Sequence, residues 1–164
     1  MYQDFKDLLS AFHAQNVKYL IVGGYAVSFH GQPRATKDID VFIKADPANA
    51  KAVYAALLAL GAPLEDFTTE DLSDPRQFIR FGREPLAVDI LPGIDGVEFD
   101  AAWERRVEGL VDTDSGLKAF FISRDDLIAS KLAAGRMRDL ADVEDIREAS
   151  KSLGSQTESS GPRE

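Results

Sequence analysis

The chain has 164 residues, 45% of them hydrophobic and 29% charged, which predicts one soluble globular domain with a core of its own. It contains no cysteine and only two histidines, which excludes disulfides and thiolate zinc sites and leaves oxygen ligands for any metal, as magnesium or manganese prefers. The formal net charge of −9 argues against broad non-specific binding to nucleic acid. Because neither a membrane-spanning apolar run nor a secretion signal is found, we expect a cytoplasmic protein that does not bind membranes.

Apolar spacing and helix caps predict alternating helices and strands in the first half of the chain. Tyr2, Phe5 and Phe12 recur at helical spacing, and Asp46 followed by Pro47 is typical of a helix start. The elements expected here are a helix at 2–12, a strand at 17–22, a short helix at 26–29, a strand at 39–43 and a helix at 48–60.

The second half is expected to contain further strands and to end in helices. Ser123, with a carboxylate three residues later, has the pattern of a capping box. The elements expected are strands at 78–81 and 87–91, a helix at 99–106, a strand at 117–122, and helices at 124–135 and 138–153. The polar tail at 154–164 is expected to be disordered, which leaves one domain at 1–153. Strands and helices mix without regular alternation, so the predicted fold class is α+β.

Three aspartates stand on two of the expected strands. Asp38 and Asp40 are two residues apart and therefore share one face of a strand, whereas Ile39 between them faces the core. Asp89 interrupts an apolar stretch, where an unpaired carboxylate would be costly. If the two strands pair, the three carboxylates converge and can hold divalent metal for phosphoryl transfer. The alternative is that Asp38 and Asp40 are solvated residues on an exposed sheet face.

A glycine pair, Gly23-Gly24, falls where the strand at 17–22 meets the next helix. Free backbone N–H groups at a helix start can hold a phosphate, and glycine permits its close approach. A tight turn without any ligand is the alternative. Arg34 is placed to neutralise phosphate charge, and Thr36 either contacts the ligand or stabilises the turn before Asp38.

Polar residues also fall on the apolar faces of the last two expected helices. Lys131 lies within the apolar arc of the first of them, so it either meets a negative partner or extends along the surface to reach water. Asp139 lies within the apolar arc of the second, and Asp142 lies at the edge of that arc.

Taken together, the glycine pair, the short helix and the Asp-x-Asp strand resemble the nucleotidyltransferase superfamily, with thirteen residues between Gly24 and Asp38. The resemblance implies the DNA polymerase beta-like fold, a small mixed sheet flanked by helices with a short helical C-terminal extension. It further implies that Gly23 and Gly24 contact the nucleotide phosphates and that Asp38, Asp40 and Asp89 are catalytic metal ligands.

Lys131, Arg136, Asp139 and Asp142 together resemble a lysine, arginine and paired-aspartate pattern of small bacterial AbiEii-type toxin nucleotidyltransferases. This second resemblance implies phosphate contact by Lys131 and Arg136, and a catalytic role for Asp139, which otherwise orients one of those cations. An arginine and a threonine before Asp-x-Asp are common in such proteins, and this adds Arg34 and Thr36 to the nucleotide-binding residues.

The function expected from these resemblances is transfer of a nucleoside monophosphate from a nucleoside triphosphate to an acceptor hydroxyl, with release of pyrophosphate. Two Mg²⁺ or Mn²⁺ ions would assist. The acceptor, which is an antibiotic or other small molecule, an RNA or a protein hydroxyl, is left open, as is a role as the toxin of a toxin–antitoxin pair. The alternative is a non-catalytic binding module of the same fold that acts as an antitoxin-like partner protein.

Overall fold

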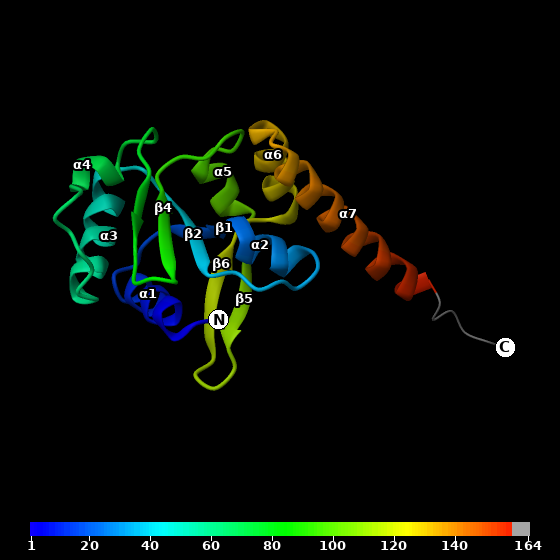
Figure 1. The fold of residues 1–164 in the computed structure, drawn as a ribbon, viewed down its shortest axis with the longest axis horizontal. Coiled ribbons are helices and arrows are strands. Elements are labelled where there is room, and N and C mark those ends of the chain that lie inside the picture. The colour runs from blue at the N-terminus through cyan, green and yellow to red at the C-terminus, as the bar shows by residue number, and fades with distance from the viewer. Residues whose placement is uncertain (159–164) are drawn as a thin grey trace.

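The computed structural model describes residues 1–158 as one mixed sheet with helices around it (Figure 1). The elements are α1 (Gln3–Ala14), β1 (Tyr19–Val22), α2 (Gly23–His30), β2 (Asp38–Ile43), α3 (Pro47–Ala59), α4 (Thr69–Leu72), β3 (Ile79–Phe81), β4 (Ala87–Leu91), α5 (Phe99–Glu104), β5 (Val107–Asp112), β6 (Leu117–Phe121), α6 (Arg124–Ala134) and α7 (Met137–Glu158). The predicted α+β class is confirmed.

The strand order, within the described residues, is β3-β4-β2-β1-β6-β5. The central strand β1 pairs antiparallel with β2 and parallel with β6, and β2 pairs in parallel with β4. The edge strands β3 and β5 are antiparallel to their neighbours. This order has a direct consequence for the polar residues, because it places the end of β1 and the middle of β4 on either side of β2.

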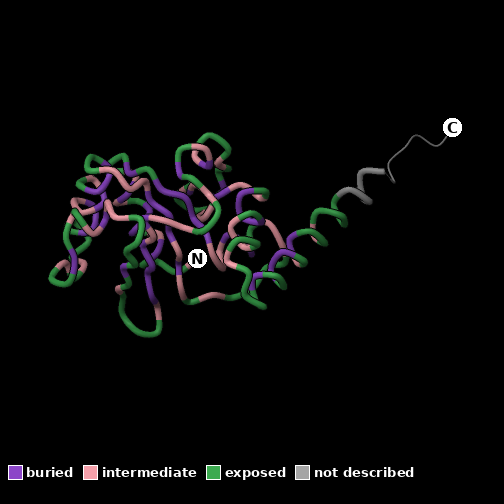
Figure 2. Tube along the Cα trace, turned by 90° about the horizontal axis from the view of Figure 1, so that it is seen from above, coloured by how far each residue is buried: buried purple, intermediate pink, exposed green. Residues whose placement is uncertain are grey.

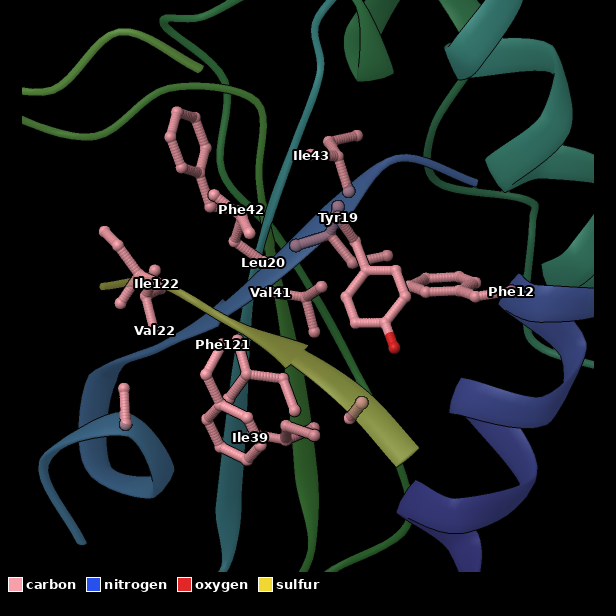
Figure 3. Packing of buried hydrophobic residues seen from close by; sticks show 14 of the residues in the cluster. Phe12, Tyr19, Leu20, Val22, Ile39, Val41, Phe42, Ile43, Phe121 and Ile122 are labelled. Carbon is pink, nitrogen blue, oxygen red and sulfur yellow. The ribbon is translucent and has the colours of Figure 1, made fainter. Parts of the chain in front are cut away.

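A continuous apolar core joins the sheet to its helices (Figure 3). The ring of Phe12 from α1 packs beside that of Tyr19 from β1, with 5.5 Å between the ring centres. Ile39 and Val41 of β2 are fully buried, as the alternation of that strand requires. Asn49 at the start of α3 is buried too, and its side chain bonds the backbone of Lys18 and Lys44, which ties the outer ends of β1 and β2 together.

The helices divide into two groups. α1 packs on α3 and β6, whereas α2 packs on β1 and β2 and also contacts α6 and α7. α7 buries one side of its first half and then runs away from the body, and its side chains at 151–153 are exposed (Figures 1 and 2). No helix within residues 1–158 is long and apolar enough to cross a membrane.

The structure corrects several predicted elements. α2 begins at Gly23, so the glycine pair forms the first turn of the helix. The edge strand β5 was not predicted, because its sequence Val-Glu-Gly-Leu-Val-Asp has no apolar run. Its Gly109 lies against the rings of Phe29 and Phe121, and a Cβ there would come within 2.8 Å of both, so a larger residue would displace them. The short helix α4 was also missed, although Thr68 and Asp71 form a capping box.

The last helix is longer than predicted. α7 continues to Glu158, five residues beyond the expected end at Leu153. The rest of the tail that the sequence predicts to be disordered, residues 159–164, lies outside the described residues.

Candidate active site

The pairing of β2 with β4 brings the three predicted carboxylates together. Asp40 stands directly opposite Asp89 in this parallel pair, and Asp38 lies two residues before Asp40 on the same side of β2. Asp89 is buried, whereas Asp38 and Asp40 are half-buried. The sheet therefore presents three acids on one surface, although they come from segments almost fifty residues apart along the chain.

The electrostatics of this cluster are unfavourable without a cation. Burial, a hydrogen bond shared with Asp89 and the negative charges of Asp89 and Asp38 raise the pKa of Asp40 to about 7, against which the charge of Lys131 acts only in part. A carboxyl with a pKa near neutrality between two other acids accepts either a proton or a metal ion. The cluster thus has the oxygen donors and the excess negative charge that suit magnesium or manganese.

Arg80, to which the sequence analysis assigned no role, occupies the space beside this cluster. It stands opposite Asp89 on β3, and its Nη1 donates to both carboxylate oxygens of Asp89 at 3.0 and 2.9 Å. Its Nη2 lies 3.5 Å from Oδ1 of Asp38. As the side chains stand, no group of three or more acidic or histidine residues in the described part of the chain is arranged to hold a metal ion. The guanidinium of Arg80 lies instead between Asp38 and Asp89.

The glycine pair lies against the same carboxylates. Gly23 has a positive φ of 64°, and a Cβ at this position would overlap the carboxylate of Asp40. A Cβ at Gly24 would lie 3.2 Å from Oγ1 of Thr36, which itself donates to the carbonyl of Asp38 at 3.1 Å. Close packing therefore requires glycine at position 23, whereas a side chain at position 24 would need Thr36 to shift by a few tenths of an ångström. Thr36 fixes the start of β2 and does not line the cleft. The first turn of α2 ends up next to the acids with its backbone N–H groups at the helix start.

Cations from α6, α7 and the loop before β2 form the opposite side of the site. Lys131 lies inward, with a side chain 15% exposed, and its Nζ is 3.4 Å from Asp139 and 3.0 Å from Asp142. Asp142 also binds Arg34 at 2.9 Å, and Asp139 also binds Arg136 at 2.6 Å. Asp142 thus joins two of the predicted phosphate-binding cations, a role that its place at the edge of the apolar arc did not reveal.

Asp139 is fully buried and kept in its charged form. Burial by itself would raise its pKa, but hydrogen bonds from Arg136 and the charge of Lys131 outweigh that effect and lower the pKa. Both oxygens of Asp139 are occupied by these cations. The contacts are those of a residue that orients Lys131 and Arg136, the second of the two roles that the sequence left open for it.

A cleft of about 640 Å³ connects the two sides. With the exception of Thr36, all the residues predicted for the site line it: Gly23, Gly24, Arg34, Asp38, Asp40, Asp89, Lys131, Arg136 and Asp139. Arg80 and Phe78 of the β3 edge line it as well, and so does Asp95. Asp38, Asp40 and Asp89 line one wall of the cleft, and the cationic side chains of Arg34, Lys131 and Arg136 lie at the other. A triphosphate bound through metal requires such a combination of acids for the metal and cations for the phosphates.

Comparison with known proteins decides the family. A family model described as "Nucleotidyltransferase of unknown function (DUF6036)" matches residues 2–150. The chain belongs to this family. As a DUF6036 nucleotidyltransferase it is an enzyme that transfers a nucleoside monophosphate, and the predicted membership of the nucleotidyltransferase superfamily is confirmed. A search of curated proteins found no significant match.

Two solved structures resemble this DUF6036 nucleotidyltransferase in fold. The lincosamide antibiotic adenylyltransferase LnuA, in its lincomycin-bound form, shares 16% identity with a TM-score of 0.59 and covers 91% of this chain and 98% of its own. The antibiotic-resistance factor ANT(2'')-Ia shares 17% identity with a TM-score of 0.57, over 93% of this chain and 84% of its own. These likenesses confirm the nucleotidyltransferase fold that the sequence predicted.

Proposed function

We propose that the protein transfers a nucleoside monophosphate from a nucleoside triphosphate to an acceptor hydroxyl in a metal-dependent reaction that releases pyrophosphate. The observation that carries the proposal is the register of β2 and β4, which sets Asp40 beside Asp89 with Asp38 on the same side. The proposed compartment is the cytoplasm, which supplies both nucleoside triphosphates and magnesium.

The three carboxylates fit the metal that this chemistry calls for. Asp38 and Asp40 would hold ions that also bind the triphosphate, and Asp89 would contribute to the ion on the acceptor side. Two magnesium or manganese ions bound there would neutralise phosphate oxygens and favour deprotonation of the acceptor hydroxyl. The raised pKa of Asp40 supports this assignment, because the group is poised to exchange a proton for a cation.

The other residues position the phosphates. The first turn of α2, at Gly23 and Gly24, offers backbone N–H groups to an anion next to Asp40. Lys131 and Arg34 supply positive charge from the opposite wall, and Asp142 holds both in place. Arg136 is oriented in the same way by Asp139, which we propose as a positioning residue and not as the catalytic base. Orientation and charge compensation of this kind account for most of the catalysis in phosphoryl transfer.

A small molecule is the acceptor class that we propose. The cleft of about 640 Å³ has the size of a small-molecule site, and the net charge of −9 disfavours an RNA acceptor. The two similar structures are, by their names, a lincosamide antibiotic adenylyltransferase and an antibiotic-resistance factor. Hydroxyl compounds of antibiotic type are therefore the first acceptors to examine, ahead of RNA and protein.

Transfer of label from nucleoside triphosphates tests the function. The four α-labelled triphosphates are incubated with magnesium and three acceptor pools: small hydroxyl compounds, total RNA and total protein. We expect wild-type enzyme to label a small acceptor and Asp40→Asn to lose this activity by about a hundredfold or more. Asp66→Asn removes an exposed carboxylate outside the cleft and is the matched control. Equal labelling by Asp40→Asn and the control would refute the assignment of the carboxylates.

The toxin role and the antitoxin-like binding role both remain predictions from the AbiEii-type resemblance. Growth of cells that express the wild-type chain separates them from the small-molecule activity. A toxin that works by nucleotidyl transfer arrests growth in the wild-type form but not as Asp40→Asn. A non-catalytic partner has the same effect in both forms.

A further inference from the structure

Arg80 makes its ion pairs with the same oxygens that a metal ion would use. Its Nη1 takes both oxygens of Asp89, and its Nη2 faces Asp38. A carboxylate oxygen has two lone pairs, but a guanidinium and a divalent cation repel each other and do not fit together in the space between Asp38 and Asp89. Binding of metal by Asp38 and Asp89 therefore requires Arg80 to leave.

The place to which Arg80 can move is open. Its side chain is 50% exposed and reaches the cleft from the edge strand β3. The other cations are held differently: Lys131 and Arg34 bind Asp142, and Arg136 binds Asp139, neither of which is a proposed metal ligand. Arg80 thus loses its carboxylate partners when metal arrives, whereas these three keep theirs.

We propose that Arg80 is an exchangeable counterion of the site. Its guanidinium pairs with Asp38 and Asp89 until a metal–triphosphate complex enters, and it then pairs with phosphate oxygens of the triphosphate. The inference rests on the proposed function, because it takes these carboxylates as metal ligands. It assigns Arg80 two successive partners. In the first state the guanidinium offsets the repulsion between the acids, and in the second it binds phosphate oxygens, for which its planar fork of donors is suited.

The exchange predicts effects of opposite sign in a single variant. Arg80→Gln removes the competitor for Asp38 and Asp89, so Mn²⁺ alone should bind about threefold more tightly. The same substitution removes a charged phosphate contact, so tripolyphosphate should bind about tenfold more weakly at saturating Mn²⁺. A residue that only supports the fold would not separate the two affinities in this way. Tripolyphosphate serves as the probe because it has no base or sugar that the site must recognise.

The experiment measures Mn²⁺ affinity by the electron paramagnetic resonance signal of free Mn²⁺, and tripolyphosphate affinity by calorimetry. Arg83→Gln is the matched control, since Arg83 lies in the same β3–β4 hairpin but does not line this cleft, and it should behave as wild type. Arg80→Lys keeps the charge but not the fork, and it should show both effects at smaller size. It also decides the matter if Arg80→Gln does not fold.

The outcomes distinguish a failure of the Arg80 exchange from a failure of the proposed metal-dependent function. Unchanged or weaker Mn²⁺ binding in Arg80→Gln, or unchanged tripolyphosphate binding, overturns the exchange while leaving metal-dependent transfer intact. Absence of Mn²⁺ binding in wild type and both Arg80 variants overturns the metal site and the exchange together. Tighter Mn²⁺ binding that is lost again in the double variant Arg80→Gln/Asp40→Asn supports both.

Discussion

Replacing Asp40 by asparagine should stabilise the metal-free protein while it destroys activity. The pKa of Asp40 is raised from 3.8 to about 7, chiefly by burial and then by Asp89 and Asp38. The unfolded chain therefore releases this proton at lower pH than the folded protein, and the folded state loses stability as the pH rises from about 4 to about 7. Each pKa unit corresponds to about 1.4 kcal/mol, so the loss reaches at most about 4 kcal/mol at pH 7 and stays constant above it. Asparagine does not ionise and has nearly the same shape, which matters because the backbone of Gly23 lies against this side chain.

Urea unfolding in the presence of a chelator measures this effect. The free energy of unfolding is determined at pH 5, 6, 7 and 8 for wild type, Asp40→Asn and the control Asp66→Asn. The advantage of Asp40→Asn over wild type should grow by up to about 1.4 kcal/mol per pH unit between pH 5 and 7 and then level off. Addition of Mn²⁺ should reduce the advantage, because the ion stabilises the wild-type acids.

Two results would refute this reasoning. If Asp40→Asn is less stable than wild type at pH 8, the carboxylate is compensated in a way that the contacts of Asp38, Asp89 and Lys131 do not show. If the advantage is present but independent of pH, it comes from packing and not from charge.

Three further substitutions test the other walls of the cleft. Gly23→Ala should lower the free energy of unfolding by more than about 2 kcal/mol, because it adds an overlap with Asp40 to the strain of a positive φ. The control Gly61→Ala, at a φ of 73° with open space around it, has the strain alone and should lower the free energy of unfolding by about 1 kcal/mol. Lys131→Gln should lower the free energy of unfolding by about 1–3 kcal/mol in urea, because Asp139 and Asp142 each lose a charged partner. The same substitution should weaken tripolyphosphate binding. The control Lys151→Gln, at an exposed position of α7, should change neither quantity. Phe78→Ser should change the melting temperature little and raise the KM of the acceptor, because this exposed ring lines the cleft next to Arg80. The control Leu58→Ser replaces an exposed apolar residue of α3 outside the cleft and should leave both quantities unchanged. An unchanged KM for Phe78→Ser would exclude an acceptor contact.

Local pattern was enough to predict which residues of β2 face the site. Alternation along a strand places Asp38 and Asp40 on one side and Ile39 on the other, whatever the strand pairs with. The partner of Asp40 is a different matter. That Asp89 stands opposite it depends on the parallel pairing of β2 and β4, whose contacts join distant parts of the sequence. The sequence marked Asp89 by its interruption of an apolar stretch and brought it to the other two acids only on the condition that the strands pair, and the register came from the fold.

Arg80 shows what local pattern leaves out. Its segment was predicted as a strand at 78–81, but a single arginine on a strand is usually solvated. Its importance comes from the antiparallel register that sets it opposite Asp89. Asp142 was likewise seen at the margin of the apolar arc, yet its bonds to Arg34 and Lys131 depend on α7 packing against α2 and α6. In both cases the missing information was the identity of the neighbouring element.

The dependence of the phosphate-binding side on Asp142 has a consequence for synthesis of the protein. The clustered acids Asp38, Asp40 and Asp89 come from β2 and β4, but Lys131 and Asp142, which holds it, come from α6 and α7. A nascent chain that has released only its first four strands carries these acids, the glycine pair and Arg34, but it lacks Lys131 and the carboxylate of Asp142 that holds Arg34 and Lys131. We therefore expect the cationic side of the cleft to form only after α7 has been synthesised.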